Sequence, residues 1–204
     1  MFVNWQTREL NIKIVYYGPA LGGKTTNLEQ IYTHVDPRRR GKMISLKTHE
    51  DRTLYFDFLQ LELGKIGTFV PKVQLYTVPG QVYYEASRRL VLRGADGIVF
   101  VADSAVNRLT DNQEAWENLR MNLAALNIPF QGLPLVVQLN KRDLSDAMPT
   151  QLMLKLLGMN GLTSFEAVAR ESTGVFDTLK AIVSQTLATE QRELLQTGSA
   201  MEHA

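Results

Sequence analysis

The chain of 204 residues contains no cysteine. This absence excludes disulfide bonds, thiolate metal sites, and lipid attachment by prenylation or palmitoylation. Residue 2 is phenylalanine, so the glycine needed for myristoylation is missing as well. The sequence also lacks an apolar run of membrane-spanning length and a signal-peptide pattern at its N-terminus. We therefore expect a cytoplasmic protein without a lipid anchor.

An excess of charge of either sign is missing too. The chain has 22 basic and 21 acidic residues and a net charge of +1. Bulk electrostatics therefore favour neither nucleic acid nor anionic lipid as a partner. The length fits one domain with a core of its own, which we place at residues 1–196. We expect the small, polar tail at 197–204 to be disordered.

A glycine-rich segment at residues 18–25, with the sequence Gly-Pro-Ala-Leu-Gly-Gly-Lys-Thr, fits the P-loop pattern G-x-x-x-x-G-K-[ST]. Small residues let backbone N–H groups surround an anion, Lys24 adds positive charge for phosphates, and Thr25 adds a hydroxyl for Mg²⁺. An apolar strand at 10–17 precedes the segment and a helical pattern follows it, as a P-loop requires. The predicted nucleotide-binding residues here are Gly18, Ala20, Leu21, Gly22, Gly23, Lys24, Thr25 and Thr26.

Strands and helices are expected to alternate along the rest of the chain. This order predicts an α/β fold with a mostly parallel sheet and helices on both faces. Further strands are predicted at 54–63, 73–78, 97–102, 133–139 and 165–169, the first two forming a hairpin through 64–67. Helices are predicted at 82–92, 110–126, 150–157 and from 175 to about 195.

A second motif, Asn140-Lys141-Arg142-Asp143, directly follows an apolar strand and matches N-K-x-D. The Asp143 carboxylate can accept both neighbouring N–H donors of guanine, whereas adenine would leave it poorly paired. Asn140 can bond the other edge of the base, and the stem of Lys141 can cover the ring. The motif therefore predicts a site that prefers guanine.

Together with Thr77-Val78-Pro79-Gly80-Gln81 and the segment at 93–103, these motifs have the order and spacing of Ras-like small GTPases. The run Gly-Pro-x-Leu-x-Gly-Lys-Thr-Thr-Asn-Leu most resembles the bacterial MglA type, which acts in gliding motility and cell polarity. The resemblance covers about residues 10–190. It implies a Ras-like P-loop NTPase fold with roughly six strands and five helices, GTP or GDP as ligand, and Mg²⁺. It also places a base-closing loop at 168–170, with Ala169 and Arg170 at the nucleotide.

The resemblance further implies the catalytic residues. Gln81 would orient the attacking water, the Gly80 backbone would respond to the γ-phosphate, and Arg52 would be an intrinsic arginine finger. Thr53 would join Thr25 as a Mg²⁺ ligand in the triphosphate state. Without the family, Gln81 and Arg52 fit ordinary surface residues, and Asp51, Thr48 and Lys47 are weaker candidates for the same region.

Two positions depart from the common Ras-like pattern. Thr77 stands where most relatives have an aspartate that holds a Mg²⁺ water, and a hydroxyl is a weaker partner for the ion. Mg²⁺ would then rely more on Thr25, the phosphate oxygens and a switch threonine, or on another acid such as Asp103. Ala20 replaces a glycine, and its methyl group would lie beside the transferred phosphate. The MglA type shares the threonine, so this departure does not imply lost activity. The alanine concerns the intrinsic rate of hydrolysis and not nucleotide binding.

The predicted strand at 54–63 changes the phase of its alternation. Apolar residues occupy positions 54, 56 and 58, and then 59, 61 and 63. A β-bulge or helices on both sides would explain this pattern. The alternative is a strand that can occupy two registers. We favour it because the resemblance to the MglA type implies a strand here that moves between the diphosphate and triphosphate states. Elsewhere, we expect Arg38 to Arg40 to be a solvated loop rather than a partner site, and Trp5 and Trp116 to serve packing.

These features indicate a guanine-nucleotide switch that hydrolyses GTP slowly. By resemblance, an MglB-type Roadblock/LC7 homodimer would act as the GTPase activator by helping to set Arg52 and Gln81. Cytoskeletal or pole-localised proteins would be further partners and would recruit the protein to a cell pole or to membrane-associated machinery. Two alternatives remain: a nucleotide-gated scaffold with negligible hydrolysis, and a P-loop phosphotransferase, for which the sequence offers no obvious lid.

Overall fold

The computed structural model describes residues 2–46, 56–65, 67–80 and 84–201. Its centre is an eight-stranded mixed sheet with the order β3-β4-β5-β2-β6-β7-β8, while β1 pairs with β2 beside this path. The strands are β1 Phe2–Asn4, β2 Glu9–Tyr17, β3 Ile44–Leu46, β4 Phe56–Glu62, β5 Val70–Thr77, β6 Gly97–Asp103, β7 Leu135–Asn140 and β8 Thr163–Glu166. Strands β5, β2, β6, β7 and β8 run parallel, whereas β1, β3 and β4 pair antiparallel with their neighbours.

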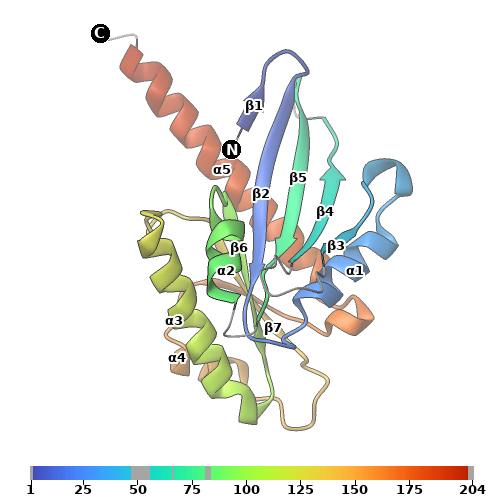
Figure 1. The fold of residues 1–204 in the computed structure, drawn as a ribbon, viewed down its shortest axis with the longest axis vertical. Coiled ribbons are helices and arrows are strands. Elements are labelled where there is room, and N and C mark those ends of the chain that lie inside the picture. Colours follow the sequence, from blue (N-terminus) through green and yellow to red (C-terminus); the bar gives the residue numbers. More distant parts are fainter. Residues whose placement is uncertain (1, 47–55, 66, 81–83, 202–204) are drawn as a thin grey trace.

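Helices cover both faces of this sheet, as Figure 1 shows. The helices are α1 Lys24–His34, α2 Glu85–Leu92, α3 Leu109–Ala125, α4 Thr150–Leu156 and α5 Val175–Met201. Side chains of β2 and β6 alternate between two cores, one beneath α1 and α5 and one beneath α2, α3 and α4. Val99 and Val101, for example, face the first core, while Ile98 and Phe100 face the second. The expected α/β Ras-like architecture is confirmed.

Several boundaries differ from the sequence-based expectation. The sheet has two strands more than the six expected, because β1 and β3 are three-residue strands too short to show a period. The last strand lies at Thr163–Glu166 rather than 165–169. Helix α5 ends at Met201 rather than near Leu195. The domain limit at residue 196 and the disordered tail at 197–204 stay predictions.

The phase change in β4 has a simple explanation in the structure. From Phe58–Tyr76 to Glu62–Lys72, β4 pairs with β5 residue by residue, so a β-bulge does not explain the phase change at these pairs. Leu59 and Leu61 are buried in the core under α1, while Phe58 contacts Tyr76 on the other face of the sheet. The inward face continues to Asp57, a buried carboxylate in a position where the alternation predicts an apolar side chain. Apolar residues thus lie on both faces, and whether β4 has a second register stays a prediction.

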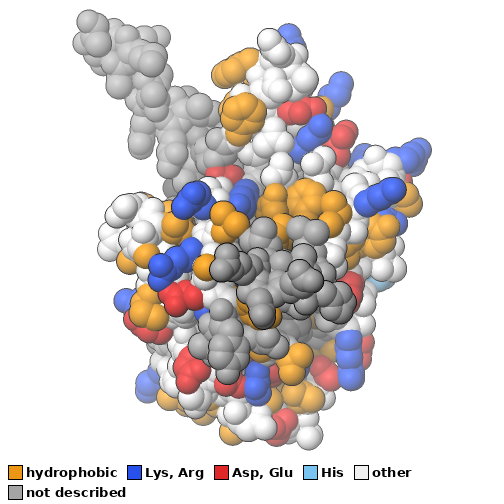
Figure 2. All heavy atoms as spheres, viewed as in Figure 1, with side chains coloured by type: hydrophobic (Ala, Val, Ile, Leu, Met, Phe, Trp, Pro, Cys, Tyr) orange, Lys and Arg blue, Asp and Glu red, His pale blue; other side chains and the backbone are white. Residues whose placement is uncertain are grey.

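The surface matches the balanced composition. Figure 2 shows basic and acidic side chains interspersed over the face that it draws. Within the described part of the chain, no helix combines the length and apolar character needed to cross a bilayer. Trp116 is buried between Phe100 and Phe130, as expected of a packing residue. The same expectation is wrong for Trp5, which is 73% exposed and touches Phe69 edge-on.

The arginines of the loop after α1 are held by local contacts. Arg38 pairs with Asp36 at 2.8 Å and remains largely exposed. The Arg40 guanidinium lies 3.5 Å from the ring centre of Tyr32 and donates to the Val35 carbonyl. These contacts agree with the solvated loop that we expected.

Candidate nucleotide site

The P-loop connects the end of β2 to the start of α1, and its shape depends on two glycines in the left-handed region. Gly18 has φ 142° and Gly23 has φ 104°. A Cβ atom on Gly18 would lie 2.2 Å from the Val101 carbonyl oxygen, and one on Gly23 would lie 2.1 Å from Nδ2 of Asn140. Any larger residue would therefore displace the loop from the neighbouring strands. Helix α1 begins at Lys24, as the motif predicts.

Lys24 is the first residue of α1, and its side chain is buried against the preceding loop. Its ammonium donates to the carbonyl oxygens of Gly18 and Pro19 at 2.8 and 2.6 Å. Burial and, to a lesser extent, the positive charge of Arg88 lower the pKa of Lys24 to about 7, against the opposing effect of the negative charge of Asp57. A buried cation with such neighbours is prepared to gain from an anionic ligand.

A cluster of oxygen atoms lies beside the lysine. Asp57 Oδ2 accepts hydrogen bonds from the hydroxyls of Thr25 and Thr77 at 2.6 and 2.9 Å. Asp57 Oδ1 accepts from the Ser45 hydroxyl at 2.6 Å. Hydroxyl and carboxylate oxygens suit a hard cation such as Mg²⁺.

These residues face a cavity of about 720 Å³ between the P-loop, β4 and the segment that follows β5. The lining residues include Ala20, Leu21, Gly23, Lys24, Thr25, Thr26, Phe56, Asp57, Thr77, Val78, Pro79, Gly80 and Tyr84. Gly80 lies close to the P-loop, since a Cβ there would be 2.4 Å from the backbone nitrogen of Ala20. The volume falls within the range of small-molecule sites.

Asn140, at the end of β7, connects its own loop to the P-loop and to the loop at 168–170. Its Nδ2 donates to the Gly22 carbonyl at 2.8 Å, and its Oδ1 accepts from the Ala169 N–H at 2.9 Å. The structure thus brings the N-K-x-D motif, the P-loop and the loop at 168–170 together, although they are more than 25 residues apart in sequence. Nearby, Asp143 forms an ion pair with Arg170 at 2.9 Å.

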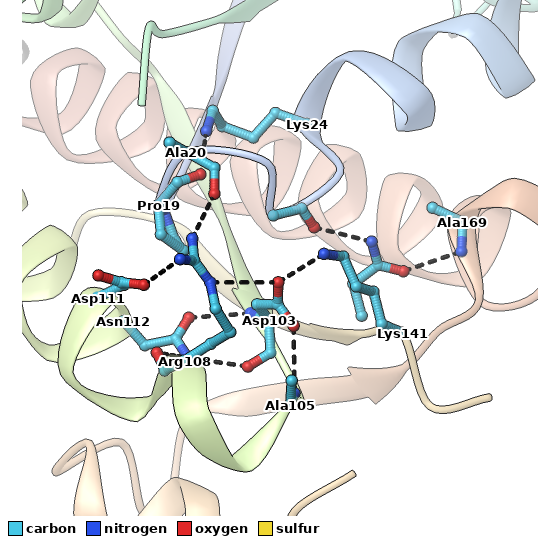
Figure 3. Close-up of polar contacts among 12 residues, drawn as sticks. Pro19, Ala20, Lys24, Asp103, Ala105, Arg108, Asp111, Asn112, Lys141 and Ala169 are labelled. Carbon is cyan, nitrogen blue, oxygen red and sulfur yellow. Dashed lines mark hydrogen bonds and ion pairs between the residues drawn. The ribbon is translucent and has the colours of Figure 1, made fainter. Parts of the chain in front are cut away.

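Lys141 and Asp103 form the adjoining part of the site, drawn in Figure 3. Lys141 has φ 66°, and its ammonium contacts Asp103 Oδ2 at 2.6 Å. Arg108 lies 3.7 Å from the same oxygen, pairs with Asp111, and donates to the Ala20 carbonyl at 2.7 Å. The Asp103 carboxylate is therefore paired with Lys141 and Arg108. The acid that accepts the hydrogen bond of Thr25 is Asp57 and not Asp103, which we considered from the sequence.

Sequence reasoning missed Asp57 and Arg108. For Asp57 the interrupted alternation of β4 was an available signal, whereas the contact of Arg108 with Ala20 spans 88 residues and has no local signature. Arg52, Thr53 and Gln81 lie outside the described residues, as do Lys47, Thr48 and Asp51. Their roles stay predictions.

Comparison with known proteins assigns the chain to a family that agrees with its fold and motifs. The model of the ADP-ribosylation factor family matches residues 1–196, and the chain belongs to this family of Ras-like small GTPases. It is 52% identical over 186 residues to the mutual gliding-motility protein MglA of Myxococcus xanthus (strain DK1622), which covers 91% of this chain and 95% of that protein. It is 27% identical over 191 residues to the Ras-related protein RABG3a of Arabidopsis thaliana, covering 91% and 87%. The resemblance inferred from the motifs is confirmed.

Proposed function

We propose that this chain is a guanine-nucleotide switch that binds GTP, hydrolyses it slowly, and signals through partners that recognise one nucleotide state. The observation that carries the proposal is the position of Asn140, whose amide bonds both the P-loop and Ala169. The motif that would recognise the base is thereby attached to a loop suited to phosphates. In the proposed complex, Asp143 exchanges its ion pair with Arg170 for the guanine edge, and Lys24 exchanges two carbonyls for phosphate oxygens.

Magnesium fits the oxygen atoms at the phosphate end of the cavity. Thr25 would hold the ion, and Thr53, outside the described residues, would join it in the triphosphate state. When bound, the ion neutralises charge on the phosphates. Gln81 would orient water, and Arg52 would stabilise the charge that develops on the γ-phosphate.

The similarity to MglA supports a role in gliding motility. We extend this role to the control of cell polarity. We place the protein in the cytoplasm, recruited to a pole by partners. Its activator would be an MglB-like Roadblock/LC7 homodimer that sets Arg52 and Gln81 rather than inserting an arginine. Cytoskeletal or polar proteins would recognise the triphosphate state.

Single-turnover GTP hydrolysis with and without a candidate activator tests this proposal. Gln81→Leu should bind GTP but lose stimulated hydrolysis, because leucine cannot orient water. Arg52→Ala should lose about 10³–10⁵ in stimulated rate, the value typical of an arginine finger. Near-parent rates for Arg52→Ala would assign the finger to the partner. Negligible hydrolysis by the parent under both conditions would favour the nucleotide-gated scaffold instead.

A further inference from the structure

The carboxylate that Ras-like proteins carry at the end of the third sheet strand is replaced here by Thr77. The structure places another carboxylate directly opposite. The register of β4 and β5 pairs Phe58 with Tyr76, so Asp57 is the next residue along and faces Thr77. The Asp57 N–H donates to the Thr77 hydroxyl at 2.9 Å, and that hydroxyl donates to Asp57 Oδ2 at 2.9 Å.

We infer that Asp57 is the residue that positions Mg²⁺ in this chain, acting through the hydroxyl of Thr25. The carboxylate that Ras-like proteins carry on the strand equivalent to β5 is thus supplied here by the neighbouring strand β4. The inference rests on the proposed function, since it requires a Mg²⁺–nucleotide ligand.

The first argument is the direction of the Thr25 hydrogen bond. The hydroxyl donates its proton to Asp57 at 2.6 Å, so its lone pairs remain available to a cation. A ligand that donates to a carboxylate is also a more basic and better oriented metal ligand. Asp57 therefore improves Thr25 as a ligand without having to touch the ion itself.

The second argument is that the surroundings hold Asp57 rigidly. The residue is 8% exposed, and three hydroxyls converge on its two oxygens, from Ser45 on β3, Thr77 on β5 and Thr25 on α1. A buried carboxylate is costly unless its oxygens are paired. Asp57 is the one acid among the inward-facing residues of β4, and these hydrogen bonds hold it on the wall of the phosphate cavity.

The third argument explains Thr77. Its hydroxyl both accepts from the backbone of Asp57 and donates to its side chain, so Thr77 fixes the position of Asp57. The threonine in place of aspartate at position 77 was expected to weaken the metal site. Its hydroxyl instead holds the carboxylate of Asp57 on the neighbouring strand β4. Asp57 lies between β4, β5 and α1, so the metal site is also coupled to the position of β4.

The test measures metal affinity rather than hydrolysis. The protein is loaded with a fluorescent GDP analogue, and its release rate is recorded while the free Mg²⁺ concentration is varied with a Mg²⁺–EDTA buffer. Asp57→Asn should raise the Mg²⁺ concentration for half-maximal retention by about 10–100-fold, as removal of such an orienting partner commonly does. Glu62→Gln, which alters an exposed carboxylate on the same strand, should leave this midpoint at the parent value.

A double variant makes the test specific. Asp57→Thr combined with Thr77→Asp returns the acid to β5 and should restore the midpoint to within a few-fold of the parent. Thermal unfolding without nucleotide and metal reports any purely structural effect, which would lower stability but leave the Mg²⁺ midpoint unchanged. An unchanged midpoint in Asp57→Asn, or a double variant no better than Asp57→Thr alone, would overturn the inference. A parent whose nucleotide release ignores Mg²⁺ would contradict the proposed function itself.

Discussion

Nucleotide binding should be accompanied by proton uptake at Lys24. In the free protein burial lowers the pKa of this ammonium to about 7, from an ordinary value of 10.5. Phosphate oxygens would replace the carbonyls of Gly18 and Pro19 and add negative charge, which raises the pKa again. At a pH above the pKa of the free protein and below that of the complex, Lys24 is largely neutral in the free protein and charged in the complex.

The size and sign of the effect follow from linkage. At about pH 8.5, binding should take up close to one proton, and the association constant should fall by up to about tenfold per pH unit between roughly pH 7 and 10. The stability of the free protein should change in the opposite direction. Because the pKa of Lys24 is lower in the folded state, its contribution to the free energy of unfolding grows as the pH rises through the same interval.

Titration calorimetry of GDP into nucleotide-free protein, in two buffers of different ionisation enthalpy, measures the protons exchanged. Lys24→Arg is the control, since arginine keeps its charge throughout this range and should bind without comparable uptake. Equal uptake in the parent and in Lys24→Arg would show that another group titrates. No uptake in the parent would contradict the lowered pKa of the buried lysine in the free protein.

Two further predictions concern the base and the core. Asp143→Asn should weaken GDP binding by about 1–3 kcal/mol, because a neutral amide cannot accept both guanine donors; an affinity within about twofold of the parent would refute the assignment. Gly97→Ala should lower the free energy of unfolding by about 1–3 kcal/mol, since the new methyl would lie 2.5 Å from Thr186 Oγ1 on α5. Urea titration beside Gly64→Ala, which meets nothing within 4 Å, checks the second prediction, and equal midpoints would contradict it.

The parts of the site that could be predicted are those with local chemistry. Gly18 to Thr25 and Asn140 to Asp143 follow buried strands, and each motif contains the residue types that its ligand requires. The long apolar strands at the centre of the sheet could be located for the same reason. The three-residue strands β1 and β3 could not, because they exist only through pairing with β2 and β4.

The contacts that escaped prediction connect distant segments. Asp57 meets Thr77 and Thr25 across separations of 20 and 32 residues, and only the register of β4 decides which face it occupies. The sequence contained the anomaly, a phase change after Phe58, but not its cause. An acid at an inward position resembles a bulge or a second register until the partner strand is known.

The single amide of Asn140 has a consequence for the entropy of binding. By linking Gly22 to Ala169, it restrains the phosphate loop and the base loop relative to each other before any ligand arrives. The conformational freedom of these segments is lost during folding, so an incoming nucleotide need not order them again. In the proposed complex, selectivity and affinity would share one origin, because a base held in the wrong orientation gains nothing from loops that cannot rearrange around it.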